Sequence, residues 1–282
     1  MALIVNTNLL SLNAQRNVKN VQGSLGIAVE RLSSGLRVNS AKDDAAGLAI
    51  SMKLTAHVRS INQAVRNAQD GVSVVQTAEG GMNEISNILT RMRELSQQAS
   101  NGTLSTTDRS ALDNEFQNLK SEITRISDTT EFNGMKLIDG TQSANGVTLQ
   151  VGINNAAADR IAIAGGTLND IDASALGLTT GTLSSIDTAA AAQSMLTMVD
   201  SAISTVATRR GNLGAIQNRL GNTIANLEIT SENLSAANSR IADADFALET
   251  ANLTKSQIIL QAGVAVLAQA NVIPQYALQL MG

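Results

Sequence analysis

Apolar residues spaced alternately three and four positions apart fill long tracts near both ends of the chain. This spacing is the a and d seam of a coiled coil, in which one narrow face of a helix packs against another helix. Neither terminal tract could bury its seam alone, so the pattern predicts that the N-terminal and C-terminal tracts pair with each other. The longest seam is Leu213, Ile216, Leu220, Thr223, Leu227, Thr230, Leu234, Ala237, Ile241, Ala244 and Leu248.

Three helices are predicted before residue 130, and the first of them is the N-terminal tract. The first ends at Ser34-Gly35, since glycine commonly follows the last helical residue. The second begins near Ser40, because Ser40 and Asp43 match an S-x-x-D capping pattern. Its seam changes phase between Val75 and Ala78, which we interpret as a local change in supercoil rather than an end. The third follows a turn at Asn101-Gly102.

Each of these helices has one apolar face. The face of the first helix is Val18, Val21, Leu25, Ala28 and Leu32. That of the second is Val58, Ile61, Val65, Ala68, Val72, Val75, Ala78, Met82, Ile85, Leu89 and Met92, and that of the third is Leu112, Phe116, Leu119, Ile123 and Ile126.

The hydrophobic period changes to two in the middle of the chain, between about residues 132 and 163. Val147, Leu149, Val151 and Ile153 alternate with polar residues or glycine, which predicts strands or a hairpin. Residues 164–185 are rich in Gly, Thr, Ser and Asp and are predicted to be a loop, and the helical pattern resumes near Asp187. The predicted fold class is mainly α: a long antiparallel helical coiled coil or bundle from both chain ends, with a small β-hairpin insertion.

The composition supports this architecture and excludes several functions. The 282 residues include three Phe, one Tyr, no Trp and one Pro, which suits long helices that meet along narrow seams. The absence of cysteine excludes disulfides and thiolate metal sites. A net charge of −4 offers no basic patch for nucleic acid.

The first residues lack the positive charges and the apolar run of a signal peptide, and no membrane insertion is expected. Taken alone, this start indicates a cytoplasmic protein unless export uses another route.

The two ends of the chain carry no charged side chains. No Asp, Glu, Lys or Arg occurs in residues 1–15 or in residues 256–282. Apolar residues of the second stretch, among them Ile258, Val266 and Leu267, do not keep to one face, and a helix that is apolar all round is a buried one. The rest of the chain offers too little apolar surface to surround it, so other copies of the chain are expected to do so.

No catalytic, cofactor or metal site is predicted, and we expect the protein to be no enzyme. His57 is the single histidine, and a solvated or half-buried helix position explains it more simply than metal binding. Asp43-Asp44 could be a carboxylate pair for acid–base chemistry, but helix capping explains these residues better. The glycines of Gly23-Ser24-Leu25-Gly26 lie inside a helical seam rather than after a strand, so this is no phosphate loop.

Several long segments resemble the bacterial flagellins. The resemblance covers nearly the whole chain outside about residues 140–185, and the segments occur in the family's order. The chain ends in LQLMG where the family commonly ends in Leu-Leu-Arg, and Ile273 and Tyr276 replace the usual polar residues around Pro274. The matching segments are ERLSSGLRVNSAKDDAAGLAIS from Glu30, LTRMRELSQQASNGT from Leu89, TEFNGMKLIDG from Thr130, LGAIQNRL from Leu213, NLSAANSRIADADFALE from Asn233 and QAGVAVLAQANVIPQ from Gln261.

The resemblance implies a structural subunit that self-assembles into the extracellular bacterial flagellar filament used for motility. Residues 1–40 with 240–282 would be terminal helices of an inner tube. Residues 41–239 would form an outer-tube helical domain that includes the hairpin and loop at about 131–185, without additional outer domains. The implied partners are identical copies in a helical homopolymer, filament cap and hook-junction proteins, an export chaperone, the flagellar type III export apparatus, which passes the unfolded chain, and host flagellin receptors.

The resemblance also assigns residues. It implies an innate-receptor contact at Arg91, Leu95, Gln98 and Glu115, with Arg91, Leu95 and Glu115 on one exposed face, although Thr90 stands where Gln is usual. Polymerisation through the terminal helices places its seams at Val18, Val21, Leu25, Leu32, Leu234, Ile241, Leu248, Ile258, Val266 and Leu267.

Three other functions compete with this interpretation. A hook–filament junction protein would share the terminal seams, but the segments Arg91–Gln98 and Glu30–Ser51 favour a flagellin. A coiled-coil signalling module of the chemoreceptor type would need a membrane span or a binding domain, and neither is visible. An enzyme within the insertion would need more polar side chains of catalytic type than residues 140–185 provide.

Overall fold

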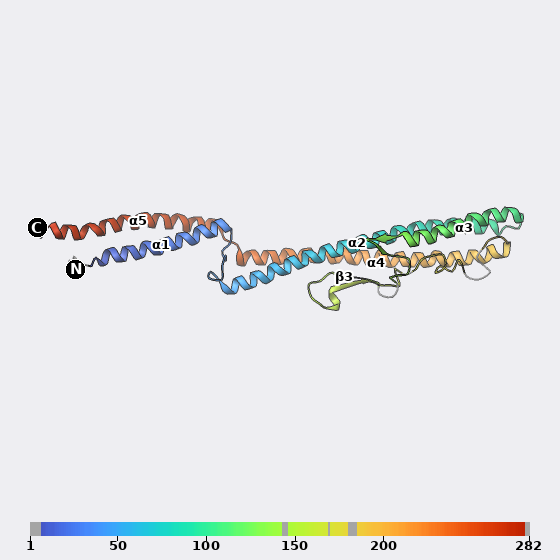
Figure 1. Ribbon diagram of the computed structural model, residues 1–282, viewed down its shortest axis with the longest axis horizontal. Helices are drawn as coiled ribbons and strands as arrows, with labels where there is room; N and C mark the ends of the chain where they lie inside the picture. The colour runs from blue at the N-terminus through green and yellow to red at the C-terminus, as the bar shows by residue number, and fades with distance from the viewer. Residues whose placement is uncertain (1–6, 143–145, 169, 180–184, 280–282) are drawn as a thin grey trace. The chain divides into compact units, whose positions relative to one another are not determined.

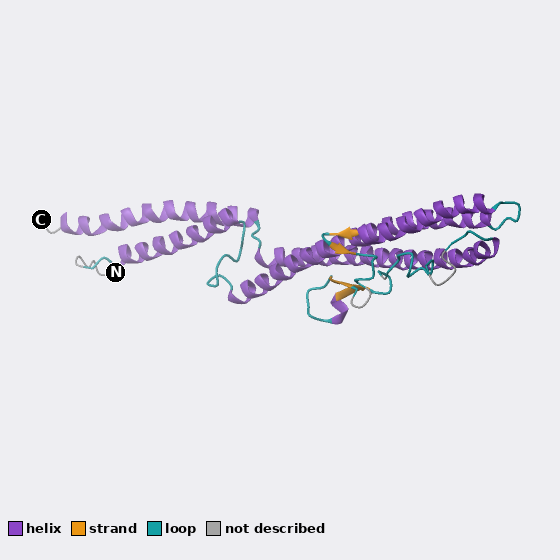
Figure 2. Cartoon of the chain, turned by 45° about the vertical axis from the view of Figure 1, so that its right-hand side comes forward, coloured by secondary structure: helices purple, strands orange, loops and turns teal. Residues whose placement is uncertain are grey.

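The computed structural model describes residues 7–142, 146–168, 170–179 and 185–279. For residues 273–279 it describes the backbone and not the side chains. Long helices and two small antiparallel sheets confirm the predicted fold class (Figures 1 and 2). The elements are α1 (Leu9–Ser34), α2 (Ala45–Ala99), α3 (Thr106–Thr129), β1 (Glu131–Phe132), β2 (Met135–Lys136), β3 (Val147–Gln150), a short 3-10 helix (Ala157–Asp159), β4 (Arg160–Ile163), α4 (Ala189–Ala242) and α5 (Phe246–Gln279).

The chain divides into two compact units. Unit 1 combines Met1–Val58 with Glu232–Gly282, and unit 2 is Arg59–Ser231. These boundaries differ from the positions near 40 and 240 at which the family resemblance places the change from inner to outer tube. The assignment of residues to inner and outer tubes stays a prediction.

In unit 1, α1 and α5 lie side by side and run in opposite directions (Figure 1). The Asn8 side chain caps α1 by accepting the backbone N–H of Ser11, and its amide nitrogen donates to the Ala270 carbonyl at 2.8 Å. Gly35 ends α1 with a left-handed φ of 71°, as its position after the seam predicts. The two ends of the chain therefore pair with each other, as expected.

The second helix begins at Ala45, so the prediction that it begins near Ser40 is wrong. The Asp43 carboxylate closes a turn before the helix by accepting from the backbone N–H and the hydroxyl of Ser40, at 3.0 and 2.8 Å. These hydrogen bonds, first of all the one from the Ser40 side chain, lower the pKa of Asp43. Asp44 supplies the cap, because its Oδ1 accepts the backbone N–H of Gly47 at 2.8 Å.

The seam predicted across positions 213–248 is interrupted, because α4 ends at Ala242 and a new helix begins at Phe246. The Ala242 carbonyl accepts the backbone N–H of Arg37 at 2.7 Å, and the N–H of Ala244 donates to the Gly35 carbonyl at 2.9 Å. The Asp245 carboxylate then caps α5 through the N–H of Ala247 at 2.9 Å. The segment after α1 and the segment between α4 and α5 thus pair through their backbones. These bonds replace the continuous helical hydrogen bonds that the periodicity alone would predict at residues 242–246.

Unit 2 contains the principal core, built from α2, α3 and α4. Helix α2 continues through Gly80-Gly81, so the change of phase is no helix end, as predicted. Gly81 allows a close approach, since a Cβ there would lie 2.7 Å from the Thr130 hydroxyl oxygen. Fully buried side chains of this core from the predicted faces are Ala68, Val75, Ala78, Met82, Ile85, Leu89, Met92, Phe116, Ile123, Leu213 and Leu220.

The insertion forms two short hairpins. Strands β1 and β2 pair through a tight turn in which Asn133 and Gly134 have φ values of 51° and 76°, the positive angles that such turns require. Strands β3 and β4 pair from Val147↔Ile163 to Gln150↔Arg160, as the alternating pattern predicts. The Asn67 side chain on α2 donates to the Gln150 carbonyl at 2.9 Å and anchors this hairpin.

The described residues between β4 and α4 contain no helix or strand, in agreement with the predicted loop, yet they contribute to the core. Leu168, Ile171, Leu178 and Ile186 are fully buried. Backbone bonds fix the segment: the N–H of Ile171 donates to the Ile138 carbonyl at 3.0 Å, and that of Ile186 to an Asp113 carboxylate oxygen at 2.8 Å. Arg209 on α4 adds a bond to the Asp170 carbonyl at 2.7 Å. The segment is therefore a strap across the core rather than a free loop.

The start of α3 provides a test of local stability. Ser105 and Asp108 form a reciprocal capping box, in which each side chain accepts the other's backbone N–H. Replacing Ser105 with Ala should lower the free energy of unfolding by about 1 kcal/mol, because an N–H of the first turn loses its acceptor. Urea unfolding followed by circular dichroism measures the change. Ser110→Ala, at an exposed position inside the same helix, is the matched control; equal losses in both variants would contradict the capping role.

Candidate functional site

Large apolar side chains that remain exposed are concentrated in unit 1. Thirteen of the fifteen found in the described part of the chain belong to this unit, and only Ile153 and Ile229 belong to unit 2. Exposed apolar side chains gathered in one part of a protein are a feature of interaction sites. The thirteen are Leu9, Leu10, Leu12, Ile27, Val29, Ile50, Met52, Phe246, Leu248, Ile258, Ile259, Val264 and Val266.

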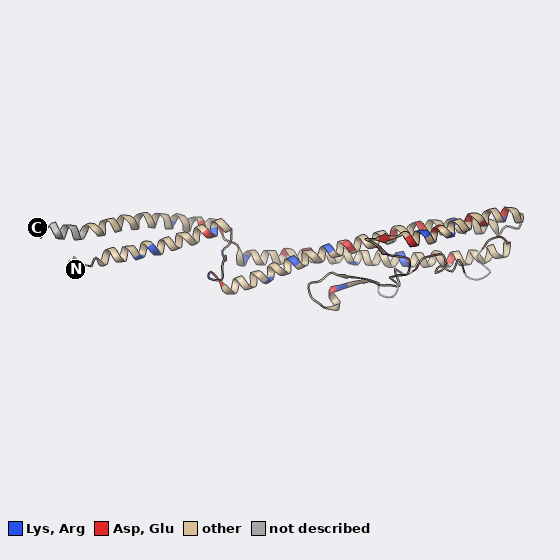
Figure 3. Ribbon diagram, in the orientation of Figure 1, with Lys and Arg blue, Asp and Glu red and all other residues tan. Residues whose placement is uncertain are grey.

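Helix α5 exposes these side chains on more than one side. Ile258, Ile259, Val264 and Val266 are 61%, 44%, 55% and 60% exposed. Because successive helical residues are rotated by about 100°, these four point in at least three directions. No charged side chain occurs after Lys255 (Figure 3). Helix α1 covers a single side of α5, so most of the apolar surface of α5 up to residue 272 has no cover among the described residues of unit 1.

The side that α1 does cover contains part of the predicted polymerisation seam. Val18 lies against Gly263, where an added Cβ would come within 2.9 Å of its methyl group. Ala28 is buried at the same contact, with 3% exposure. The half-buried predicted seam residues on α1 and α5 are Val18, Val21, Leu25, Leu32 and Leu267, whereas Leu234 and Ile241 are half-buried on α4.

The structure does not bring the other three predicted seam residues into this packing. Leu248, Ile258 and Val266 are about equally exposed, at 60%, 61% and 60%. Their exposure in a single chain leaves them available to a second copy, and their role in polymerisation stays a prediction.

An ion pair that sequence reasoning missed links α1 to α5. Arg31 Nη1 lies 2.9 Å from Glu249 Oε1, and the Glu249 side chain is only 7% exposed. Arg31 Nε is buried without a hydrogen-bond partner among the described residues. The sequence offers one signal for this pair: Glu249 is the single acidic residue on the described part of α5. No local sequence motif identifies Arg31 as its partner. The pair fixes which residues of the two helices face each other.

The residues of the predicted receptor contact lie on α2 and α3 of unit 2. Arg91 Nη2 is 2.8 Å from Glu115 Oε1, and Arg91 Nη1 is 3.1 Å from Glu94 Oε2. The Arg91 and Glu115 side chains are 49% and 44% exposed, and Gln98 is exposed. Hydrogen bonds to Glu115 and then to Glu94 raise the pKa of Arg91. Arg91 and Glu115 thus form one polar surface patch.

Leu95 does not share that surface, so the expectation of a common exposed face is wrong for this residue. Its side chain is fully buried in the core of unit 2. The reason is periodicity: Met92, Leu95 and Ala99 continue the three-and-four spacing of the α2 seam, and all three are buried.

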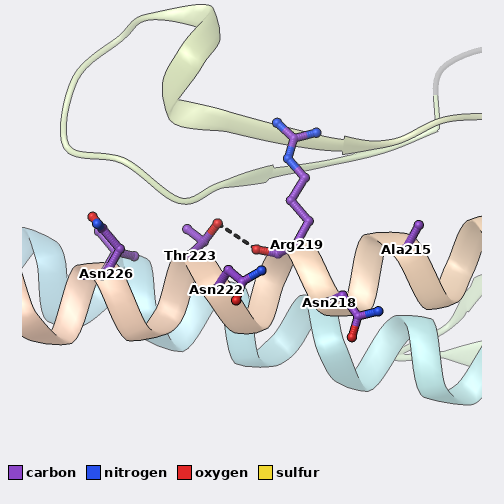
Figure 4. A pocket seen from close by; sticks show the side chains of 7 residues that line it. Ala215, Asn218, Arg219, Asn222, Thr223 and Asn226 are labelled. Carbon is purple, nitrogen blue, oxygen red and sulfur yellow. Dashed lines mark hydrogen bonds between the residues drawn. The ribbon is translucent and has the colours of Figure 1, made fainter.

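A groove in unit 2 lies along α4 and has a volume of about 630 Å³. Asn218, Asn222 and Asn226 line it at steps of four residues, and Arg219 extends toward the β3–β4 hairpin (Figure 4). The Thr223 hydroxyl donates to the Arg219 carbonyl at 2.9 Å, so it is engaged within its own helix. The lining contains no carboxylate, histidine or cysteine. This set of side chains has no acid–base pair and no activated nucleophile.

Within the parts of the chain that the structure describes, no three His, Asp or Glu side chains gather in a way that could hold a metal ion, and His57 is exposed. None of the helices in these ranges combines the length and the apolar character needed to cross a membrane.

Comparisons with known proteins agree across the chain. Residues 5–143 match the model of the bacterial flagellin N-terminal helical region, and residues 196–281 match that of the C-terminal helical region. A flagellin of Halalkalibacterium halodurans is 48% identical over 279 residues, covering 99% of this chain and 100% of the relative. A flagellin of Bacillus subtilis is 41% identical, covering 98% and 99%. The structure of a putative flagellar hook-associated protein from Vibrio parahaemolyticus has a TM-score of 0.56 at 19% identity and covers 71% of this chain and 100% of that one, a likeness of fold alone.

The Arg31–Glu249 pair provides a test of the contact between α1 and α5. Glu249→Gln should destabilise this contact by about 2 kcal/mol, because it leaves the half-buried Arg31 charge without its counter-ion. Hydrogen exchange of the α1 and α5 backbone amides should become faster while that of α3 stays unchanged. Glu30→Gln is the control, since Glu30 is exposed and an amide oxygen can still accept the hydrogen bond from Asn39. Equal exchange in both variants would show that the pair does not hold the helices together.

Proposed function

The chain belongs to the bacterial flagellin family, and we propose that it polymerises mainly through the helices of unit 1. As a member of this family it is a structural protein, a subunit of the extracellular flagellar filament, which consists of identical copies. The observation that carries the proposal is the concentration of exposed large apolar side chains in unit 1.

The packing within unit 1 explains why a second copy is the partner. Helix α5 exposes Ile258, Val264 and Val266 in different directions, whereas α1 covers one side only. Burying a side chain of this size is worth roughly 1.5–3 kcal/mol, so covering several of them drives association. A contact between different surfaces of identical copies, repeated with a constant rotation, generates a helical filament.

The finer architecture that we propose is the one that the family resemblance implies. Residues 1–40 with 240–282 form the inner tube, where charge-free ends suit a crowded apolar environment, and residues 41–239 form the outer tube. The subunit passes unfolded through the flagellar type III export apparatus with the help of a chaperone. It then joins a polymer bounded by hook-junction proteins and the filament cap. The alternative of a hook–filament junction protein shares the fold, but full-length relatives named flagellin favour the filament subunit.

A substitution on α5 tests polymerisation through unit 1. Ile258→Gln should leave the helicity of the monomer unchanged, because the side chain is 61% exposed, and should raise the critical concentration for assembly about tenfold. Electron microscopy and sedimentation after salting out measure filament yield. Ile229→Gln is the matched control, with the same residue type and 60% exposure in unit 2. Normal assembly of Ile258→Gln, or an equal defect in the control, would refute polymerisation through this face of α5.

We also propose that the Arg91–Glu115 patch binds the vertebrate innate receptor for flagellin. The support is geometric: Arg91 lies on α2, Glu115 lies on α3, and each is close to half exposed while paired at 2.8 Å. Gln98 is exposed further along α2, where it extends the same family motif. Leu95 supports the patch from the core, because its buried side chain holds this part of α2 against the rest of unit 2.

A pair of arginine variants tests receptor binding. Arg91→Ala should weaken receptor activation by the monomer at least tenfold, because a charged group that reaches two carboxylates is lost from the patch. Arg93→Ala is the control: its side chain is also 49% exposed and is also paired, but with Asp200 on α4. A reporter-cell assay on folded monomers gives the ratio of the two effects. Equal activation by both variants would remove Arg91 from the receptor contact.

A further inference from the structure

Met52 differs from the other methionines of this chain. Of the six whose side chains the structure describes, Met52 alone is exposed, at 65%, whereas Met82, Met92 and Met195 are 0% exposed. The remaining two, at positions 135 and 198, are half-buried. An oxidant in solution therefore reaches the Met52 thioether directly, while the fold shields the three fully buried sulfur atoms.

The surroundings of Met52 connect this exposure to assembly. Met52 lies in the second turn of α2, within unit 1, and Ile50 of the same turn is 49% exposed. Both belong to the thirteen exposed apolar side chains that the proposed polymerisation covers. A side chain that contacts little in the monomer but becomes buried in the polymer contributes to assembly and almost nothing to the fold.

We infer that Met52 is an oxidation site at which conversion of the thioether to the sulfoxide weakens polymerisation. The assembly part of this inference rests on the proposed function. In the reaction, a lone pair on sulfur attacks one oxygen of hydrogen peroxide and the O–O bond breaks. Sulfur gains that oxygen and is oxidised, and the second oxygen leaves as water after proton transfer. The sulfoxide is polar, so burying it in an apolar contact is unfavourable.

The selectivity of oxidation is tested on the monomer. After brief treatment with hydrogen peroxide, peptide mass spectrometry should find the added oxygen on Met52 well before Met82, Met92 or Met195. In assembled filaments Met52 should become protected. Oxidation of Met52 no faster than that of the buried methionines would overturn the inference at its first step, whether or not the chain polymerises.

The consequence is tested by assembly of the oxidised monomer. Treated wild-type protein should show a critical concentration about tenfold higher than untreated protein, with unchanged helicity, and methionine sulfoxide reductases should reverse the change. Met52→Leu should assemble equally well with and without peroxide. An equal loss in this variant would assign the effect to another methionine and refute the role of Met52.

Two further outcomes separate this inference from the proposed function. If untreated wild-type protein forms no filaments, the proposed function fails. If it forms filaments, and protein carrying the Met52 sulfoxide does so equally well, only the oxidation inference fails. Met52→Gln introduces a polar side chain of similar length without peroxide and should raise the critical concentration by a similar factor; normal assembly of this variant would also overturn the inference.

Discussion

Burial of a narrow apolar seam between antiparallel helices is the interaction on which this molecule depends. In unit 2, α2 has α3, α4 and the strap, formed by the described residues between β4 and α4, around it, and its seam residues Met82, Ile85 and Leu89 are fully buried. In unit 1, α1 and α5 have mainly each other, and most of the seam is only half-buried. The same sequence pattern therefore produces a fully buried core in unit 2. In unit 1 it leaves an apolar surface that we propose other copies of the chain cover.

The chain contains almost no large aromatic side chains, and this explains why its helices need so many neighbours. Ala, Val, Ile and Leu fill a seam that is one or two side chains wide, and each contributes roughly 1–3 kcal/mol when buried. A two-helix contact such as that of α1 with α5 offers few such positions and includes small residues such as Ala28 and Gly263. Close approach follows from these small residues, whereas Ile258, Ile259, Val264 and Val266 of α5 remain outside the contact.

Polar contacts select the register of these seams more than they stabilise them. Coiled seams of aliphatic residues tolerate slippage by one repeat, because one turn resembles the next. The Arg31–Glu249 pair in unit 1 and the Arg93–Asp200 pair in unit 2 each join helices that are distant in sequence. The exposed second pair adds little free energy. The largely buried Glu249 is different, since its charge is unfavourable in any register that separates it from Arg31.

The sequence by itself determined the helical seams and the hairpin, because each depends on a local period that side-chain chemistry dictates. The pairing of the chain ends followed from two terminal seams that neither tract could bury alone. It also indicated the apolar, charge-free character of α5, which is a property of composition. Only the tertiary structure decided where α4 stops, since its end depends on backbone pairing between residues 35–38 and 242–244. The Arg31–Glu249 pair and the strap that contains Ile171 likewise became visible only in three dimensions. Each depends on a partner remote in the chain, and no periodicity of a single segment records which distant residue will face it.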